Sequence, residues 1–192
     1  MMNDENIVIR ALEPEDLEYL YQWENDMDLW EVSDTLTPFS HFTLKKYIEN
    51  SHQDIYEAKQ LRLMITDEAN HNPIGLIDLY DFDPYHLRAG LGIMIHDIEN
   101  RKKGYASSAV KLMTDYCFET LGLNQVYSSV PSSNIASLQL FKSLGFSQTG
   151  YRKQWLRRGS EWEDVIYFQL LASEWNQQKK RSVCCVFFYS WI

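Results

Sequence analysis

The sequence feature that most constrains this chain is a strand, a basic glycine turn and a helix in direct succession. Residues 91–95 (Leu-Gly-Ile-Met-Ile) have the composition of a strand, and residues 101–106 (Arg-Lys-Lys-Gly-Tyr-Ala) form a basic turn. Apolar residues three and four positions apart then predict an amphipathic helix. Because the first N–H groups of a helix lack intrahelical partners and the helix dipole is positive there, the arrangement predicts an anion-binding site.

The composition of the turn suits a ligand that carries several phosphates. Gly104 lets the backbone come close to the ligand, and Arg101, Lys102 and Lys103 add positive charge beside the fixed N–H donors. A basic turn also precedes many helices that bind nothing, and from this stretch alone both interpretations stand equally. Two other phosphate motifs are absent, G-x-x-x-x-G-K-[ST] and a G-x-G-x-x-G that opens a helix.

Length, composition and charge narrow the class of protein. A chain of 192 residues with 45% apolar residues is expected to form one folded domain and not a disordered chain. The formal net charge of -9 argues against a nucleic-acid partner, because phosphate backbones bind basic surfaces. An acidic protein attracts cations, which weakly favours an amine substrate.

The cysteine spacing and the lengths of the apolar runs indicate the cellular compartment in which the protein is expected. Cys117, Cys184 and Cys185 have neither the spacing of a metal site nor that of a disulfide framework, so we expect no metal and a reducing compartment. The N-terminus lacks the basic start and apolar run of a signal peptide, and no apolar run reaches the roughly 18 residues that a membrane span needs. The expected location is cytoplasmic.

The order of predicted elements indicates an α/β (α+β) fold. Helices are expected after Pro14, after Thr43 as a capping residue, at 106–117 with Gly122 at its end, and at 134–144 before Gly145. Strands are expected at 7–12, 61–65, 74–80, 87–95, 125–130, 146–156 and 162–171. The sequence therefore predicts a mixed, mostly antiparallel central sheet of about seven strands with helices on both faces.

Four motifs, together with the order of the predicted elements, resemble the GNAT superfamily of acyl-CoA N-acyltransferases. Residues 101–106 match its R/Q-x-x-G-x-A/G signature in every specified position. The others are Asn-Ile-Ala-Ser-Leu at 134–138 followed by Leu-Gly-Phe at 144–146, the opening at 9–17, and Trp-Glu-Asp-Val-Ile-Tyr at 162–167. Over residues 7–175 the chain looks most like the branch of ribosomal-protein alanine and spermidine/spermine N-acetyltransferases. We predict a single domain at 1–175 and a basic, then apolar, tail at 176–192 of open role.

The resemblance implies acetyl-CoA as the acyl donor and assigns residues to it. Ile93, Met94 and Ile95 would pair through their backbone with the pantetheine arm, which would also suit the glycines at positions 90 and 92. Asn134 would contact the cofactor, and Lys142 would either add charge near the phosphates or be a solvated helix residue. The pyrophosphate would be held by Arg101, Lys102, Lys103, Gly104, Tyr105 and Ala106.

One position departs from the pattern of the resembled branch. In the polyamine enzymes a tyrosine that protonates the departing CoA thiolate usually stands where this chain has Phe141. Phenylalanine has no proton to donate. Ser137 matches a serine of the ribosomal-protein branch, so Ser137 or a bound water is the predicted replacement, although a helix serine can also bond only its own backbone.

The predicted base is Asp78, an aspartate within an otherwise apolar strand near the expected acceptor cleft. It would take the proton as a primary amine attacks the thioester directly in a ternary complex. The acceptor would be a polyamine, another small amine or a protein N-terminus. The alternatives are a catalytically silent acyl-CoA-binding module, for which Phe141 is the argument, and a nucleotide-binding protein, which the missing lysine motif disfavours. The apolar tail and the aromatic content allow a homodimer.

Overall fold

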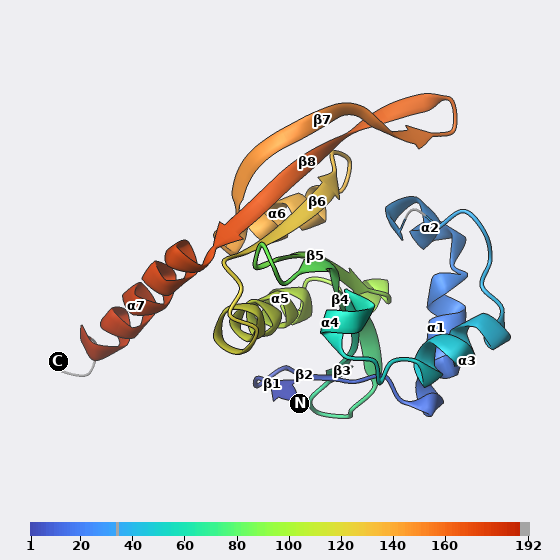
Figure 1. Ribbon diagram of the computed structural model, residues 1–192, viewed down its shortest axis with the longest axis horizontal. Coiled ribbons are helices and arrows are strands. Elements are labelled where there is room, and N and C mark those ends of the chain that lie inside the picture. The colour runs from blue at the N-terminus through green and yellow to red at the C-terminus, as the bar shows by residue number, and fades with distance from the viewer. Residues whose placement is uncertain (34, 189–192) are drawn as a thin grey trace.

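The fold is one eight-stranded mixed sheet, seen in a computed structural model that describes residues 1–33 and 35–188, with the backbone alone for 31–33 and 181–188. The strand order is β1-β2-β3-β4-β5-β6-β8-β7 (Figure 1). Among the strands of the described residues, only the β5–β6 pair is parallel. The strands are β1 (Met2–Asn3), β2 (Ile7–Arg10), β3 (Leu61–Asp67), β4 (Pro73–Asp83), β5 (Arg88–Ile95), β6 (Gln125–Pro131), β7 (Ser147–Arg158) and β8 (Glu161–Leu171).

Helices cover both faces of the sheet, as the sequence predicted. On one face lie α5 (Tyr105–Asp115), which continues as a π-helical turn (Tyr116–Thr120), and α6 (Ile135–Ser143). The other face carries α1 (Leu17–Glu24) and α3 (His41–Glu49), with α2 (Met27–Ser33) following α1. Short 3-10 turns occur at Pro14–Asp16 and Ile98–Asn100, and the remaining helices are α4 (Ile55–Ala58) and α7 (Ala172–Phe188).

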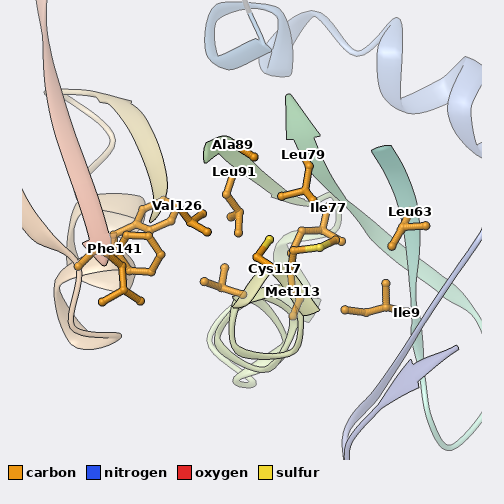
Figure 2. Close-up of a cluster of buried hydrophobic side chains, with 14 of the residues drawn as sticks. Ile9, Leu63, Ile77, Leu79, Ala89, Leu91, Met113, Cys117, Val126 and Phe141 are labelled. Atoms are coloured by element: carbon orange, nitrogen blue, oxygen red, sulfur yellow. The ribbon is translucent and has the colours of Figure 1, made fainter. Parts of the chain in front are cut away.

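Two apolar cores result because successive strand residues point to opposite faces. In β4, Ile77 and Leu79 face α5, whereas Leu76 faces α1 and α3. In Figure 2, side chains from β2, β3, β4 and β5 point toward Met113 and Cys117 of the α5 segment: Ile9, Leu63, Ile77, Leu79, Ala89 and Leu91. Burial in this core raises the pKa of the Cys117 thiol to about 12, so the thiol stays protonated at neutral pH.

Local details differ from the sequence predictions where an element is very short or where two residues could fill the same role. Ser40, and not Thr43, is the N-cap of α3, since its Oγ accepts the N–H of Thr43 at 3.1 Å. Both residues are good capping types, and the backbone geometry decides between them. The two-residue β1 and the four-residue α4 were not predicted because neither is long enough to show a period. Gly122 and Gly145 have positive φ and follow their helical segments as expected.

The C-terminal helix α7 follows β8 directly and projects away from the sheet (Figure 1). Its first turns are fastened to the α5 segment. The Trp175 Nε1–H donates to Asp115 Oδ1 at 2.8 Å, and Lys179 Nζ lies 2.6 Å from Glu119 Oε1. The predicted boundary between 175 and 176 thus falls inside a helix. The apolar end of the tail at 189–192 lies outside the described residues, and no helix within them is long and apolar enough to cross a membrane.

Candidate active site

The candidate site lies where the parallel strands β5 and β6 separate. Residue pairing between β5 and β6 ends at Gly90 opposite Tyr127. Beyond that point β6 turns toward the β7–β8 hairpin while β5 stays beside β4 (Figure 1). A cavity of about 430 Å³ occupies the gap, lined by Tyr80, Leu91, Gly92, Ile93, Ser128, Ser129, Val130, Pro131, Asn134, Ser137, Phe141, Trp155, Leu156, Val165 and Tyr167.

One edge of β5 is left open at this cavity. Ile93, Met94 and Ile95 pair with Ile77, Leu76 and Gly75 of β4 on one side. On the β6 side, the described residues pair with β5 only at Arg88–Gly90. Backbone N–H and C=O groups of a strand without a neighbour are free to bond an extended ligand. This is the edge along which the sequence predicted the pantetheine arm.

The start of α5 has the geometry of an anion site. Gly104 is its N-cap with φ of 89° and offers no side-chain oxygen to the free N–H groups. A Cβ built on Gly104 would meet nothing within 4 Å, so the backbone is open to an approaching ligand. Lys102 also has a positive φ, and residues 101–104 are all exposed. These features fit the diphosphate of CoA.

The charged side chains around this turn are partly held in place. The Arg101 guanidinium donates from Nε to the Ile95 carbonyl at 3.4 Å, and Lys103 Nζ lies 3.2 Å from Asn100 Oδ1. Tyr105 donates from its hydroxyl to Asp67 Oδ2 at 2.6 Å, which lowers the pKa of Asp67 and raises that of Tyr105. The last bond ties the first residue of α5 to the end of β3.

Helix α6 brings two predicted residues into the cavity. Asn134 is its N-cap, with Oδ1 accepting the Ser137 N–H at 3.1 Å, and both residues line the cavity. Phe141 also lines the cavity, and its side chain is 2% exposed. Its ring packs edge-on against the Phe146 ring, with centroids 5.1 Å apart. Lys142 is exposed and is not among the lining residues. Phe141 therefore presents an apolar wall at the position where the resembled branch has a phenol.

Sequence reasoning did not single out two tyrosines of the cavity, Tyr80 on β4 and Tyr167 on β8. Burial raises the pKa of Tyr80, and hydrogen-bonding groups of Ser129 partly oppose the rise. The Tyr167 ring lies against the Arg152 guanidinium, 4.8 Å from its centroid. A tyrosine two residues beyond Asp78 in an otherwise apolar strand was a signal that could have identified Tyr80.

Asp78 belongs to an ion-pair network on the face that carries α1 and α3. Its Oδ1 and Oδ2 accept from Nε and Nη2 of Arg62 at 2.7 and 3.0 Å, and Arg62 Nη1 also contacts Glu24. Burial alone would lower the pKa of Arg62, but the charge and hydrogen bonds of Asp78, and then the charge of Glu24, raise it. Asp78 is not among the cavity-lining residues. Gly92 does line the cavity, and a Cβ built on Gly92 would lie 3.8 Å from the Asp78 Cβ.

A second ionic pair lies on the same face at the end of β5. Nε2 of His96 is 3.3 Å from Asp26 Oδ2, and its Nδ1 is 3.0 Å from Asp97 Oδ1. The imidazole stacks on the Trp23 ring with centroids 5.4 Å apart. The α1 side of the site is therefore rich in carboxylates. Within the described residues no group of three or more His, Cys, Asp or Glu is placed to hold a metal ion.

Comparisons with known proteins agree with this geometry. Residues 6–147 match the model of the acetyltransferase (GNAT) domain family. The chain is 30% identical over 153 residues to the spermidine N(1)-acetyltransferase of Escherichia coli K12, a match covering 78% of this chain and 77% of that protein. It is 30% identical over 105 residues to the putative ribosomal N-acetyltransferase YdaF of Bacillus subtilis, covering 55% and 57%.

Among solved structures, the spermidine N-acetyltransferase from Vibrio cholerae in complex with CoA and spermine superposes with a TM-score of 0.79. The sequences are 24% identical, and the match covers 89% of this chain and 98% of that one. At this identity the likeness concerns the fold. The mixed sheet and its covering helices are therefore shared with that acetyltransferase.

Proposed function

Because the chain belongs to the GNAT acetyltransferase family and is an acetyl-CoA-dependent N-acetyltransferase, we propose that its acceptor is a small amine with more than one positive charge, of the polyamine class. The observation that carries this proposal is the charge on the face that carries α1, where Asp78 lies next to Gly92 of the cavity wall. Glu24, Asp26 and Asp78 face one guanidinium and one imidazole there. The excess of carboxylates, within a chain of net charge -9, favours the approach of a polycation.

The proposed donor geometry follows from the open edge and the helix start. The diphosphate of acetyl-CoA lies at the Gly104 N–H groups, and the pantetheine arm runs along Ile93, Met94 and Ile95. The thioester then reaches the cavity, where the amine nitrogen attacks its carbonyl carbon and the C–S bond breaks. A backbone N–H of the open β5 edge stabilises the carbonyl oxygen as it gains charge.

The attacking nitrogen must lose a proton before or during the reaction. An alkylammonium with a reference pKa near 10.4 is neutral in about one molecule in 2,500 at pH 7, a deficit of roughly 4.6 kcal/mol. We keep Asp78 as the proposed base, with the condition that the substrate ammonium replaces Arg62 as its partner. Both Asp78 oxygens are bound to Arg62 in the free protein, so this pair must open before Asp78 can accept the proton.

The base role is tested with Asp78→Asn. If Asp78 takes the proton, kcat for spermidine falls at least 100-fold while the Kd of acetyl-CoA stays within twofold, and the acidic limb of the pH–rate profile changes. If only KM for spermidine rises and the pH profile keeps its shape, Asp78 contributes charge alone. Glu24→Gln is the matched control, since it removes a carboxylate from the same Arg62 without touching Asp78.

A second acceptor class, the α-amine of a protein N-terminus, is favoured by one observation. None of the described residues that line the cavity is a carboxylate or an imidazole. An α-amine with a pKa near 7.8 has a deficit of only about 1 kcal/mol at pH 7, so it can react without a base. The absence of a base from the cavity wall therefore costs this acceptor less than it costs a polyamine.

A substrate panel at pH 7 and pH 9 separates the two classes. We expect kcat/KM for spermidine to exceed that for butylamine at least tenfold, to fall as salt is added, and to rise from pH 7 to pH 9. A peptide that outperforms spermidine at pH 7, with a rate that is level above pH 8, would contradict the polyamine assignment. CoA binding without transfer to any acceptor would instead support the silent-module alternative.

We also propose that the chain forms a homodimer through the outer edge of the sheet. β7 is the last strand, and its outer edge has no strand partner among the described residues. Exposed aromatic residues lie on this hairpin: Tyr151, Trp155 and Trp162. Light scattering should give a dimer mass for the wild type and a monomer mass for Tyr151→Glu, which leaves the cavity lining unchanged. A wild-type monomer would contradict the proposal.

A further inference from the structure

One glycine on β5, Gly90, makes room for a tyrosine ring from β4. Tyr80 pairs with Gly90 in the β4–β5 ladder, and a Cβ built on Gly90 would lie 2.1 Å from the Tyr80 Cε2 atom. A Cβ on Gly92 would lie 3.9 Å from Cε1 of the same ring. The Tyr80 ring therefore lies across β5 in the space that the missing side chain of Gly90 leaves.

This path brings the phenol to the reaction cavity. Tyr80 starts on β4 and lines the cavity together with Ser129, a residue of β6 on the far side of β5. Ser129 is close enough to act on the pKa of the phenol. The Tyr127 ring packs edge-on against Tyr80, with centroids 6.0 Å apart at 89°, which holds the ring in this direction.

Cleavage of the thioester calls for a proton donor near the CoA sulfur. When the C–S bond breaks, sulfur keeps the electron pair and leaves as a thiolate unless a nearby group protonates it. The cavity has serine hydroxyls and two phenols, and a phenol with a reference pKa of about 10 is a far stronger acid than a serine hydroxyl. Phe141 has no proton to give, and of the two phenols Tyr80 is the one whose ring lies against β5, the strand along which the thioester is proposed to run.

We propose that Tyr80 is the catalytic acid that protonates the departing CoA thiolate, a role that rests on the amine acetylation proposed above. As the C–S bond breaks, the phenol O–H bond breaks and an S–H bond forms. The amine nitrogen loses one proton in the same reaction. Water relays this proton to the phenolate, so the cycle needs no outside proton. Burial keeps the pKa of Tyr80 above its ordinary value, and the donor form therefore predominates at neutral pH.

Tyr80→Phe tests the proposal, because it keeps the ring and removes only the hydroxyl. We expect kcat for acetyl transfer to fall at least 100-fold, with the Kd of CoA within twofold and the thermal midpoint nearly unchanged. Gly90→Ala keeps the hydroxyl but displaces the ring, and should lower kcat at least tenfold. Tyr85→Phe removes the hydroxyl of an exposed tyrosine that does not line the cavity, so it is the matched control and should stay within twofold of the wild type.

Ser137→Ala provides the competing outcome. If Ser137→Ala causes the 100-fold loss and Tyr80→Phe stays within threefold of the wild type, the proposal is overturned and the serine is the donor. A wild type that acetylates no amine would overturn the proposed function and this inference together. A wild type that acetylates amines, with Tyr80→Phe equally active, would overturn this inference alone.

Discussion

The proposed donor and acceptor sides of the site are built in different ways. The proposed donor side consists of backbone: the open edge of β5 and the first N–H groups of α5 after Gly104, all within one short stretch of chain. The acceptor side consists of side chains from distant elements, since Arg62 of β3 joins Glu24 of α1, 38 residues away, to Asp78 of β4, 16 residues away. Backbone groups recognise what every CoA ester shares, whereas paired side chains can change with the acceptor.

The difference also concerns strength. On the proposed donor side, the first N–H groups of α5 are held in place by the helix and have no intrahelical partner, so they can bind an anion. The carboxylates of the proposed acceptor side are already bound to Arg62 and His96. We therefore expect substitutions on the donor side to act on CoA affinity, and substitutions on the acceptor side to act on stability and on amine selectivity.

The largest expected effect is that of Gly104→Glu on CoA binding. The new side chain must adopt a φ of 89°, and its charge would oppose the diphosphate at the helix start. We expect the Kd of CoA, measured by isothermal titration calorimetry, to rise about 100-fold, which corresponds to about 2.7 kcal/mol.

Gly104→Ala is the matched control for this variant. It introduces the same backbone strain without a charge, so it should cost stability while raising the Kd of CoA much less than Gly104→Glu does. An unchanged Kd in Gly104→Glu would break the comparison, because the diphosphate would then bind elsewhere.

A smaller effect is expected when Arg62 is removed from the acceptor side. Arg62→Ala leaves Glu24 and Asp78 facing each other without a cation. We expect the free energy of unfolding, from urea titration, to fall by about 2 kcal/mol, less than for a fully buried pair because the three side chains are 14–28% exposed. KM for spermidine should fall, since two carboxylates become available to the substrate.

Arg88→Ala is the control for the loss of an arginine ion pair. Arg88 is bound to Asp83 at the surface, 3.3 Å away, and half exposed, so no measurable change in unfolding free energy is expected. If Arg62→Ala is as silent as Arg88→Ala, the network does not organise the acceptor side.

The smallest effect is the pH-dependent stability contributed by the Tyr105–Asp67 bond. The pKa of Asp67 is lowered in the folded state, so its contribution is present above the unfolded value of 3.8 and is lost as pH falls through the folded pKa. The pKa of Tyr105 is raised, so the same bond weakens as pH rises above 10. Tyr105→Phe should be less stable than the wild type by about 0.5 kcal/mol at pH 7.

Urea titrations at pH 3, 7 and 10.5 check this window. The difference between Tyr105→Phe and the wild type should be largest at pH 7 and should shrink at both extremes. A difference that is constant across the three pH values would mean that the ring contact, and not the hydroxyl bond to Asp67, stabilises the start of α5.

The sequence predicted the features that local patterns encode. The strand, turn and helix around Gly104 follow from periodicity and glycine placement, and the central antiparallel sheet with helices on both faces follows from the order of elements. The resemblance to GNAT enzymes was also correct. The residue roles assigned from it, including those of Lys142 and Ser137, stay predictions.

Features that depend on side chains meeting across the fold were not predicted. Asp78 was noticed as an anomaly, but its partner Arg62 lies on a different strand and Glu24 on a helix, and no local spacing relates them. From the sequence, the glycines at 90 and 92 were related to the pantetheine arm and not to a side chain of β4. In the structure the ring of Tyr80 fills the space beside Gly90. Strand register, which decides that pairing, is a property of the assembled sheet.

The most direct test of the account is a crystal structure with CoA bound. We predict the diphosphate at the N–H groups that follow Gly104, the pantetheine arm paired with Ile93, Met94 and Ile95, and the sulfur in the cavity within hydrogen-bonding reach of the Tyr80 hydroxyl. A coenzyme bound away from the start of α5, or with its arm off the open edge of β5, would contradict it.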